Sequence, residues 1–252
     1  MFLRAIMASN RESFVVSDRI LRRNMAAPIP SGPGLGLLAM AMLLAVFGIP
    51  ASAAEDNLSL NARLLASARA EDRTGIERAL QQGAAVDSRN RLGETALIVV
   101  LKSNRPDLAR LMLDAGANVN QPAINGVTPL MAAAHGGHTG IVRALLEKGA
   151  DVGAVDRIGK NAMTYAAGEG HTEVVRLLVA QGDDPNAIYR NDLTALMWAA
   201  GYGRAETAQA LLDAGARPDL VDNRGKSALD IAREWKDAAT VLLLERAVAA
   251  KK

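Results

Sequence analysis

The sequence predicts an all-α solenoid, in which about six helix–turn–helix units stack side by side and are joined by β-hairpin-like turns. Five glycines stand 33 residues apart without an insertion, and five residues that can cap a helix keep the same step. A fixed period of this length marks a stacked repeat array, which presents an elongated binding surface rather than a chemical pocket. The glycines are Gly83, Gly116, Gly149, Gly182 and Gly215, and the capping residues are Thr95, Thr128, Asn161, Thr194 and Ser227.

The composition agrees with a repeat array. Half of the residues are hydrophobic but only 3% are aromatic, so we expect a core of Ala and Leu side chains rather than of large rings. The absence of cysteine excludes disulfides and a lipid-modified cysteine, and it leaves the redox compartment open.

The first 54 residues differ from the rest and predict a secretory signal peptide. Five arginines precede a Pro/Gly segment, residues 35–49 carry no charge, and the small residues 51–54 follow. A basic region, a short apolar region and an A-x-A-like site predict cleavage near Ala53 or Ala54, and a periplasmic or secreted product. A membrane span needs about 20 apolar residues, which is more than this run provides. The short run therefore favours a cleaved signal peptide, and an uncleaved inner-membrane anchor is the alternative. Initiation at Met25 would remove all five arginines. Because a signal peptide is expected to carry some basic residues there, we expect the longer chain that begins at Met1.

Removal of the leader changes the charge argument. The whole chain has 29 basic and 27 acidic residues and a pI near 9.0. Five of the basic and two of the acidic residues lie in the first 54 positions, which leaves 24 basic and 25 acidic residues. Because the remainder is nearly neutral, nucleic acid is not an expected partner.

Each unit has the same predicted anatomy, which is clearest in residues 125–152. Thr128 can cap a first helix, and Pro129 fits the first turn of that helix. Gly137 and His138 interrupt the helical pattern, and Gly149 can end a second helix in a left-handed conformation. Small residues on the first helix would let its neighbour approach closely. The apolar positions are Leu130, Ala133 and Ala134 on the first helix and Ile141, Val142, Leu145 and Leu146 on the second.

This pattern resembles the ankyrin repeat, G-x-T-P-L-H-L-A-A followed by G-H-x-E-V-V-x-L-L-L and G-A-D-V-N. Residues 170–178 (GHTEVVRLL) and 116–120 (GANVN) repeat that motif nearly letter for letter, and the resemblance covers roughly residues 58–246. The family's His after Leu is absent, so its Thr-to-His hydrogen bond cannot form. That position is filled by Ile98, Met131, Thr164, Met197 and Asp230.

The period divides the chain into segments. A signal peptide would occupy residues 1–54, and residues 55–90 lack the Gly-x-Thr opening, as an N-terminal capping repeat would. Four repeats follow at residues 91–123, 124–156, 157–189 and 190–222. Residues 223–252 form a C-terminal capping repeat with a short basic tail. There Glu245 replaces an apolar residue, and a polar outer face is what a terminal repeat requires.

The resemblance implies that a partner protein binds the hairpin tips and the first helices on the concave side. Arginines recur at or beside one tip position and predict a basic rim, which suits an acidic segment of the partner. Tyr202 and Trp235 lie one repeat apart, and aromatic and Arg residues are common interface anchors. Trp198 is predicted to belong to the core. The candidate partner-binding residues are Arg91, Lys102, Asn125, His135, Arg157, Lys160, Glu169, Arg190, Asn191, Tyr202, Arg224 and Trp235.

No motif predicts catalysis, a cofactor or a metal. Gly225-Lys226-Ser227 resembles the end of a phosphate-binding loop, but the required first glycine is Leu220. The resemblance implies that His138 and His171 hydrogen-bond loop backbone between repeats. A His-based metal or small-ligand site formed with His135 is therefore a weaker alternative.

The sequence thus predicts a monomeric, non-catalytic ankyrin-repeat interaction module that is exported from the cytoplasm and binds a partner protein. Two alternatives stay open: a scaffold tethered to the membrane by residues 35–49, and the His-based metal or small-ligand binder.

Overall fold

The computed structural model describes residues 51–250, and their side chains from Ser59 onward. Contacts divide the chain at Ser59, and residues from Leu60 onward form one compact unit. Most of the predicted signal peptide, residues 1–50, lies outside the described residues. The predicted cleavage site near Ala53 or Ala54 lies where no side chain is described. No helix in the described range is both long and apolar enough to span a membrane.

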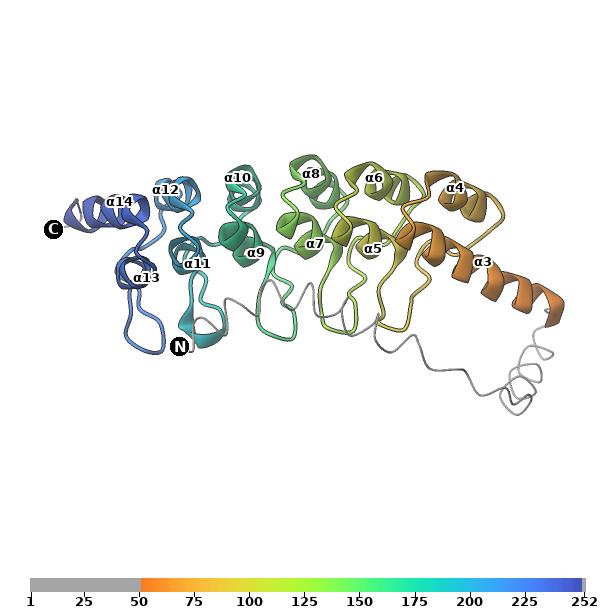
Figure 1. The fold of residues 1–252 in the computed structure, drawn as a ribbon, viewed down its shortest axis with the longest axis horizontal. Helices are drawn as coiled ribbons and strands as arrows, with labels where there is room; N and C mark the ends of the chain where they lie inside the picture. Colours follow the sequence, from red (N-terminus) through yellow and green to blue (C-terminus); the bar gives the residue numbers. More distant parts are fainter. Residues whose placement is uncertain (1–50, 251–252) are drawn as a thin grey trace. The chain divides into compact units, whose positions relative to one another are not determined.

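The described range contains twelve α-helices in six pairs, which confirms the predicted all-α solenoid (Figure 1). We call the first helix of each pair inner and the second outer. The inner helices are α3 (Ala51–Arg69), α5 (Ala96–Lys102), α7 (Pro129–His135), α9 (Ala162–Glu169), α11 (Ala195–Gly201) and α13 (Ala228–Trp235). The outer helices are α4 (Arg73–Gln81), α6 (Pro106–Asp114), α8 (Thr139–Glu147), α10 (Thr172–Ala180), α12 (Ala205–Asp213) and α14 (Ala238–Ala249).

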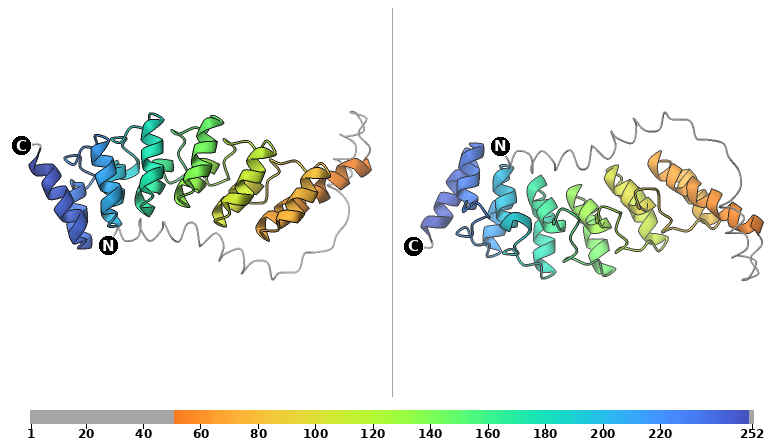
Figure 2. Two further views of the ribbon diagram at one scale, coloured as in Figure 1. Left: turned by 90° about the horizontal axis from the view of Figure 1, so that it is seen from above. Right: turned by 90° about the horizontal axis from the view of Figure 1, so that it is seen from below.

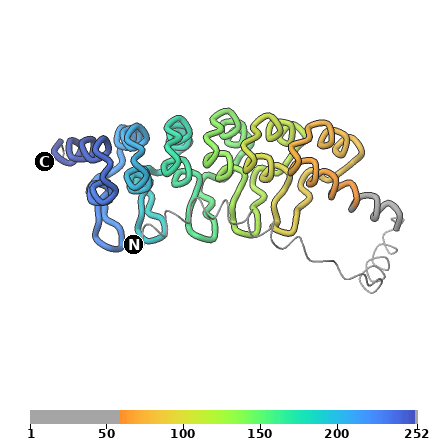
Figure 3. Tube along the Cα trace, in the orientation of Figure 1, coloured from red at the N-terminus to blue at the C-terminus, as the bar shows by residue number. Residues whose placement is uncertain are grey.

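The pairs stack by like-with-like packing. From α5 onward each inner helix contacts the next inner helix, and from α6 onward each outer helix contacts the next outer helix. Figure 2 shows the outer helices side by side along the array. The long loops between pairs all project from the inner-helix side (Figure 3). A short 3-10 helix, η1 (Arg190–Asp192), lies in the loop before α11.

The five predicted capping residues all start their helices. Each side-chain oxygen accepts a hydrogen bond from the backbone N–H three residues later, at 2.9 Å for Asn161 and 3.2–3.4 Å for the other four. This satisfies one of the N–H groups that a helix start leaves without an intrahelical partner. Pro129 occupies the first turn of α7, as predicted.

Small residues line the seam between inner helices. One position per repeat is fully buried there, and its side chain is Ala in four of five repeats, so the backbones can approach closely. The residues are Val100, Ala133, Ala166, Ala199 and Ala232, each with 0% exposure. Trp198 is 3% exposed, which confirms its assignment to the core.

The last outer helix ends the array with a charged residue. Glu245 in α14 is exposed and accepts a 2.7 Å hydrogen bond from Arg233. The same phase holds Leu or Val in every earlier repeat, so a charged side chain stands at the end of the array where the earlier units have an apolar one.

The glycine that follows each of the outer helices α4, α6, α8, α10 and α12 has a positive φ, between 80° and 94°. We expect Gly149→Ala to lower the free energy of unfolding by about 1 kcal/mol, because an L side chain is strained at φ +80°. Gly140→Ala in α8 is the matched control. Its φ is ordinary and an added methyl would meet nothing within 4 Å, so we expect a gain of about 0.5 kcal/mol. Urea denaturation measures the free energy of unfolding of both variants. Equal changes in the two would contradict the explanation from backbone conformation.

Candidate interaction surface

Aromatic and charged side chains meet on the inner helices of the third to fifth pairs. Figure 1 shows these helices, α7, α9 and α11, as neighbours in the middle of the array. We call this group the central cluster. Its members are His135 at the end of α7, Lys160 in the following hairpin, Tyr165 and Glu169 of α9, Trp198 of α11, and Tyr202 at the end of α11.

Lys160 lies inside the structure, which corrects its predicted place at an exposed tip. Its side chain is 4% exposed, and Nζ lies 4.4 Å from the ring centroid of Trp198 and 5.4 Å from that of Tyr165. The residue before the helix cap is also buried in the two neighbouring repeats, where it is Val127 and Leu193. Burial lowers the pKa of Lys160 to about 8, although Asp156 and Glu169 oppose the shift.

Tyr165 ties the inner helix to its own hairpin. Its hydroxyl donates a 2.7 Å hydrogen bond to Asp156 Oδ2, while Asp156 Oδ1 accepts from the backbone N–H groups of Ile158 and Lys160 at 3.0 and 2.9 Å. Burial, together with the Asp156 charge, raises the pKa of the Tyr165 phenol. The phenol therefore remains a hydrogen-bond donor at neutral pH.

A second side of the central cluster is ionisable. His135 Nε2 lies 3.8 Å from Glu169 Oε1, and Arg204 Nη2 lies 4.0 Å from Glu169 Oε2. The His135 ring meets the Tyr165 ring edge-on, with centroids 5.8 Å apart. Burial lowers the pKa of His135, an effect that the charge of Glu169 opposes. This favours a neutral imidazole at pH 7.

The aromatic side chains continue from the core to the surface. The rings of Trp198 and Tyr202 are stacked, with centroids 6.2 Å apart and planes at 17°. Tyr202 is half-buried, and Trp235, one repeat further on, is 37% exposed. Trp198 Nε1 is buried and has no hydrogen-bond partner in the described part of the chain. A partner protein can therefore reach Tyr202 and Trp235 but not Trp198.

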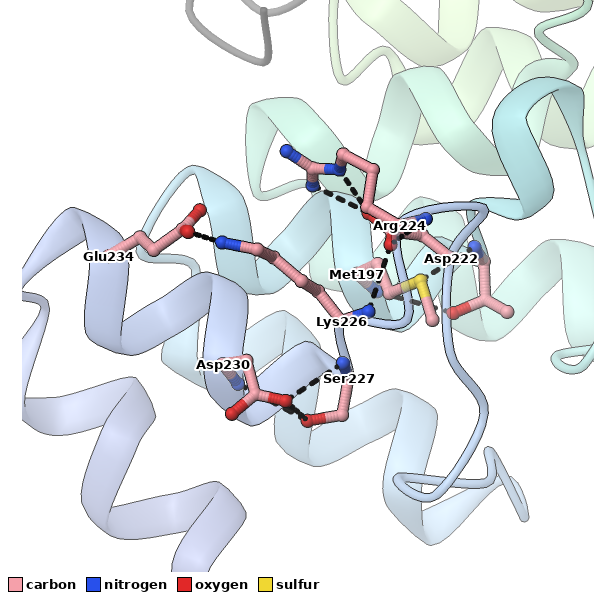
Figure 4. Close-up of polar contacts among 8 residues, drawn as sticks. Met197, Asp222, Arg224, Lys226, Ser227, Asp230 and Glu234 are labelled. Carbon is pink, nitrogen blue, oxygen red and sulfur yellow. Dashed lines mark hydrogen bonds and ion pairs between the residues drawn. The ribbon is translucent and has the colours of Figure 1, made fainter. Parts of the chain in front are cut away.

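The predicted basic rim is smaller than the sequence suggests. Arg91, Arg157 and Arg190 are exposed. Arg224 is exposed as well, but it pairs with Asp222 of its own hairpin, with Nε 2.9 Å from Oδ2 (Figure 4). Lys226 points to Glu234 in the same view. Because Arg224 is compensated locally, we define the basic rim as Arg91, Arg157 and Arg190.

The remaining predicted residues have local roles. Lys102 Nζ lies 2.7 Å from Glu94 Oε1, and this pair is partly buried. Asn125 Oδ1 accepts a 3.2 Å hydrogen bond from the Val127 N–H and shapes its own turn. Asn191 adopts φ +64° inside η1. Of the twelve predicted residues, the structure brings together His135, Lys160, Glu169 and Tyr202, and it places the others elsewhere on the inner helices and hairpins.

Sequence reasoning missed Tyr165, Asp156 and Arg204. Tyr165 and Trp198 share one phase of the repeat, where the other units hold Val99, Ala132 and Ile231. Two bulky rings at a position of aliphatic residues were the available signal. No sequence signal indicated the hydrogen bond from Tyr165 to Asp156, because a spacing of nine residues predicts no contact unless the hairpin geometry is known.

The histidines at the Gly-His position differ from each other. His171 Nε2 contacts the His135 carbonyl oxygen at 2.9 Å, which confirms the predicted backbone contact between repeats. Arg204, one period later, donates from Nε to the Gly168 carbonyl at 3.1 Å and takes the same role. His138 Nε2 is buried and has no hydrogen-bond partner in the part of the chain that the structure describes, so the backbone contact implied for His138 does not form at this nitrogen. Within the described residues, no three His, Cys, Asp or Glu side chains lie together as a metal ion would require.

A polar network joins the fourth repeat to the hairpin before α11. Asn161 Nδ2 donates to Tyr189 Oη at 2.8 Å and lies 3.3 Å from Asp183 Oδ2. Burial raises the pKa of Asp183 to about 6, although the Asn161 hydrogen bond opposes the shift. Every other described repeat has Ala at this phase, namely Ala84, Ala117, Ala150 and Ala216.

Comparison with known proteins identifies the repeat. A family model described as ankyrin repeats (3 copies) matches residues 64–156, 117–189, 143–222 and 163–251. A human protein named mitochondrial disaggregase is 36% identical over 92 residues, which are 36% of this chain and 12% of that protein. A bovine protein of the same name is 37% identical over 90 residues, or 36% and 13% of the two chains. The chain thus spans only a small part of the length of these relatives.

We expect Asp183→Ala to stabilise the protein above pH 7 by about 1–2 kcal/mol, since it removes a partly buried carboxylate. Because the folded-state pKa of about 6 exceeds the ordinary 3.8, the folded state takes up this proton first as pH falls. The advantage of the variant should therefore shrink between pH 6 and 4. Denaturation of both proteins across this range measures it, and a constant difference would contradict the shifted pKa.

Proposed function

Because this chain belongs to the ankyrin-repeat family, we propose that it is a non-catalytic interaction module that binds a segment of another protein on its concave inner-helix and hairpin surface. The observation that carries the proposal is the central cluster, where aromatic rings stack from the core out to a half-buried tyrosine. Rigid aromatic side chains with part of their area exposed are the usual anchors of protein interfaces. Tyr202 and Trp235 have this character.

The charge of the surface supports an acidic segment as the ligand. No carboxylate of the described residues forms an ion pair with a residue of the basic rim, Arg91, Arg157 and Arg190. Exposed guanidinium groups without a local counter-charge can pair bidentately with carboxylates. The near-neutral charge of the chain after residue 54 favours an acidic peptide over a nucleic acid.

The stretch that matches the two relatives covers only 12% and 13% of their length, so the proposal for this chain does not include disaggregase activity. Ankyrin repeats generally bind other proteins, which supports such a role here. A monomer in solution is part of the same proposal.

We further propose that the module is exported. This rests on the sequence of residues 1–54, with its arginines, its uncharged run at residues 35–49 and its small residues before Glu55. The second candidate is a membrane-tethered module, which the same uncharged run favours if it is not cleaved.

Two alanine substitutions test the binding surface. Protein partners captured by crosslinking from an envelope extract are identified, and the affinity of the purified partner is measured. We expect Tyr202→Ala combined with Trp235→Ala to weaken binding by about tenfold or more, because both anchors lose their rings. Leu242→Ala, in an exposed side chain of outer helix α14, is the matched control and should bind normally. Unchanged binding by the double variant, with its helical content intact, would refute the concave surface.

The intact mass of the native protein tests export. We expect a mature N-terminus at Ala54 or Glu55 and recovery in the soluble envelope fraction, because signal peptidase cleaves after small residues. A full-length mass together with recovery in the membrane fraction would refute cleavage and support the tethered form.

A further inference from the structure

The hairpin before α11 lacks a side chain that organises most of the other hairpins. In three of the other four, an Asn or Asp oxygen accepts hydrogen bonds from two backbone N–H groups of its own turn. These residues are Asn90, Asp156 and Asp222. Tyr189 stands at that phase in the hairpin before α11, and its phenol cannot accept from its own turn as a short carboxyl or amide does.

The same hairpin also lacks the turn glycine. In the other four hairpins a glycine at one phase adopts a left-handed conformation, with φ between 70° and 85°. These glycines are Gly93, Gly126, Gly159 and Gly225. Asp192 takes that phase with φ +58°, and Asn191 before it has φ +64°. Because left-handed backbone is unfavourable for residues with a Cβ, even for Asn and Asp, this turn is less stable by itself than the glycine turns.

A backbone hydrogen bond between neighbouring hairpin tips is missing at this place as well. The N–H groups of Ile124, Arg157 and Asn223 each donate to a carbonyl of the preceding hairpin, at 2.9, 2.9 and 3.1 Å. Arg190 has the same phase, but within residues 51–250 its N–H makes no such bond to the preceding hairpin. The hairpin before α11 is therefore not joined through its tip backbone to the hairpin before α9.

Side chains of the fourth helix pair hold this hairpin instead. Asn161 caps α9 through Oδ1, which accepts from the Thr164 N–H at 2.9 Å, and its Nδ2 donates to Tyr189 Oη at 2.8 Å. The other four capping residues are Thr or Ser, which have no amide group to donate in this way. Asp183 Oδ2 lies 3.3 Å from the same Nδ2. One amide thus joins the hairpin tyrosine to the carboxyl that follows α10.

The Asp183 carboxyl lies in a place that suits its neutral form. Its backbone N–H donates to the Leu178 carbonyl at 3.1 Å, which fixes the residue at the end of α10. The groups that face the carboxyl are Asp184 on its own loop, the phenol of Tyr189 from the hairpin, and the uncharged Asn161 from α9. Within the described residues no basic side chain forms an ion pair with Asp183. Burial of its charge is therefore not compensated by a cation.

We propose that Asn161, Tyr189 and Asp183 form an acid-sensitive latch on the hairpin before α11. While the Asp183 carboxyl is protonated it has no charge to hydrate, so the three side chains stay together and the hairpin stays closed. When the carboxyl loses its proton, its charge favours water over the buried place, and the hairpin opens more often. Opening moves Arg190, which this hairpin carries, away from its place beside Arg157. The latch acts in the isolated protein, so it does not depend on the proposed partner.

The direction and the size of the effect follow from proton linkage. The carboxyl has a pKa of about 6 in the closed hairpin and an ordinary value near 3.8 when it is exposed, so the closed form binds the proton more tightly. Closure therefore strengthens as the pH falls from 6 to 4, and it is weakest above pH 7. The difference between the two pKa values corresponds to roughly a hundredfold in the closing equilibrium. Because solvent reaches the half-buried carboxyl, we expect about tenfold.

Hydrogen–deuterium exchange of the purified native protein, corrected for the intrinsic pH dependence of amide exchange, tests the latch. We expect the protection of residues 187–193 to rise by about tenfold between pH 7.5 and pH 5, because local opening exposes their amides. The hairpin before α9 is the internal control. It has Ala150 at the phase of Asp183 and the regular tip bond from Arg157, so its protection should stay constant.

Two variants separate the latch from other causes. Asp183→Asn keeps an acceptor for Asn161 and never ionises, so we expect high protection of the hairpin at both pH values. Tyr189→Phe removes the oxygen that Asn161 binds, so the hairpin should lose protection at both pH values while α9 and α11 keep theirs. The proposal is overturned if the unaltered hairpin shows no pH dependence, if Asp183→Asn retains it, or if Tyr189→Phe has no effect. A parallel change in the hairpin before α9 would also overturn it, in favour of a global loss of stability.

Discussion

Each helix pair of this protein can bury its apolar faces only against the pairs beside it, and the rest of the structure depends on that constraint. The helix pairs between residues 51 and 250 have no central core for distant segments to share, so every unit must present the same shape to its neighbours. The fully buried small side chains between inner helices, such as Ala133, Ala166 and Ala199, meet this requirement. The 33-residue step without insertions is the consequence in sequence, since one extra residue would displace every later contact of its unit.

Residues that leave the common pattern are therefore informative, and they concentrate in the fourth and fifth pairs. Lys160 takes an inward phase that is apolar in the neighbouring repeats, and Asp183 takes a phase that is otherwise Ala. Tyr165 and Trp198 replace smaller aliphatic side chains at a third phase. Burial disfavours the charged forms of both Lys160 and Asp183, so these residues reduce stability at neutral pH. Such costs in a natural protein commonly accompany binding sites.

The fold was predictable from the sequence because each of its determinants is local. A capping oxygen acts on an N–H three residues away, and Gly149 has its positive φ whatever partner the protein binds. The surface was less predictable, because exposure depends on how the hairpin folds back. Lys160 is predicted at the tip from its place beside variable residues, and the charged residues Glu94 and Lys226 share its phase, so only the structure shows that it is buried. The exposure of hairpin residues such as Val155 and Ile188, at 55% and 61%, needed the structure, since exposed and buried aliphatic residues look alike in a sequence.

The hairpins show how a repeat array can vary its surface without disturbing its packing. The backbone N–H of Ile124, Arg157 and Asn223 each donates to a carbonyl of the preceding hairpin, at 2.9, 2.9 and 3.1 Å, and so keeps neighbouring tips in register. The hairpin before α11 instead contains η1, where Asn191 and Asp192 both have positive φ. Tyr189 and Asn161 hold that hairpin through side chains. Because the inner helices beneath continue their regular contacts, the change is confined to the surface that a partner meets.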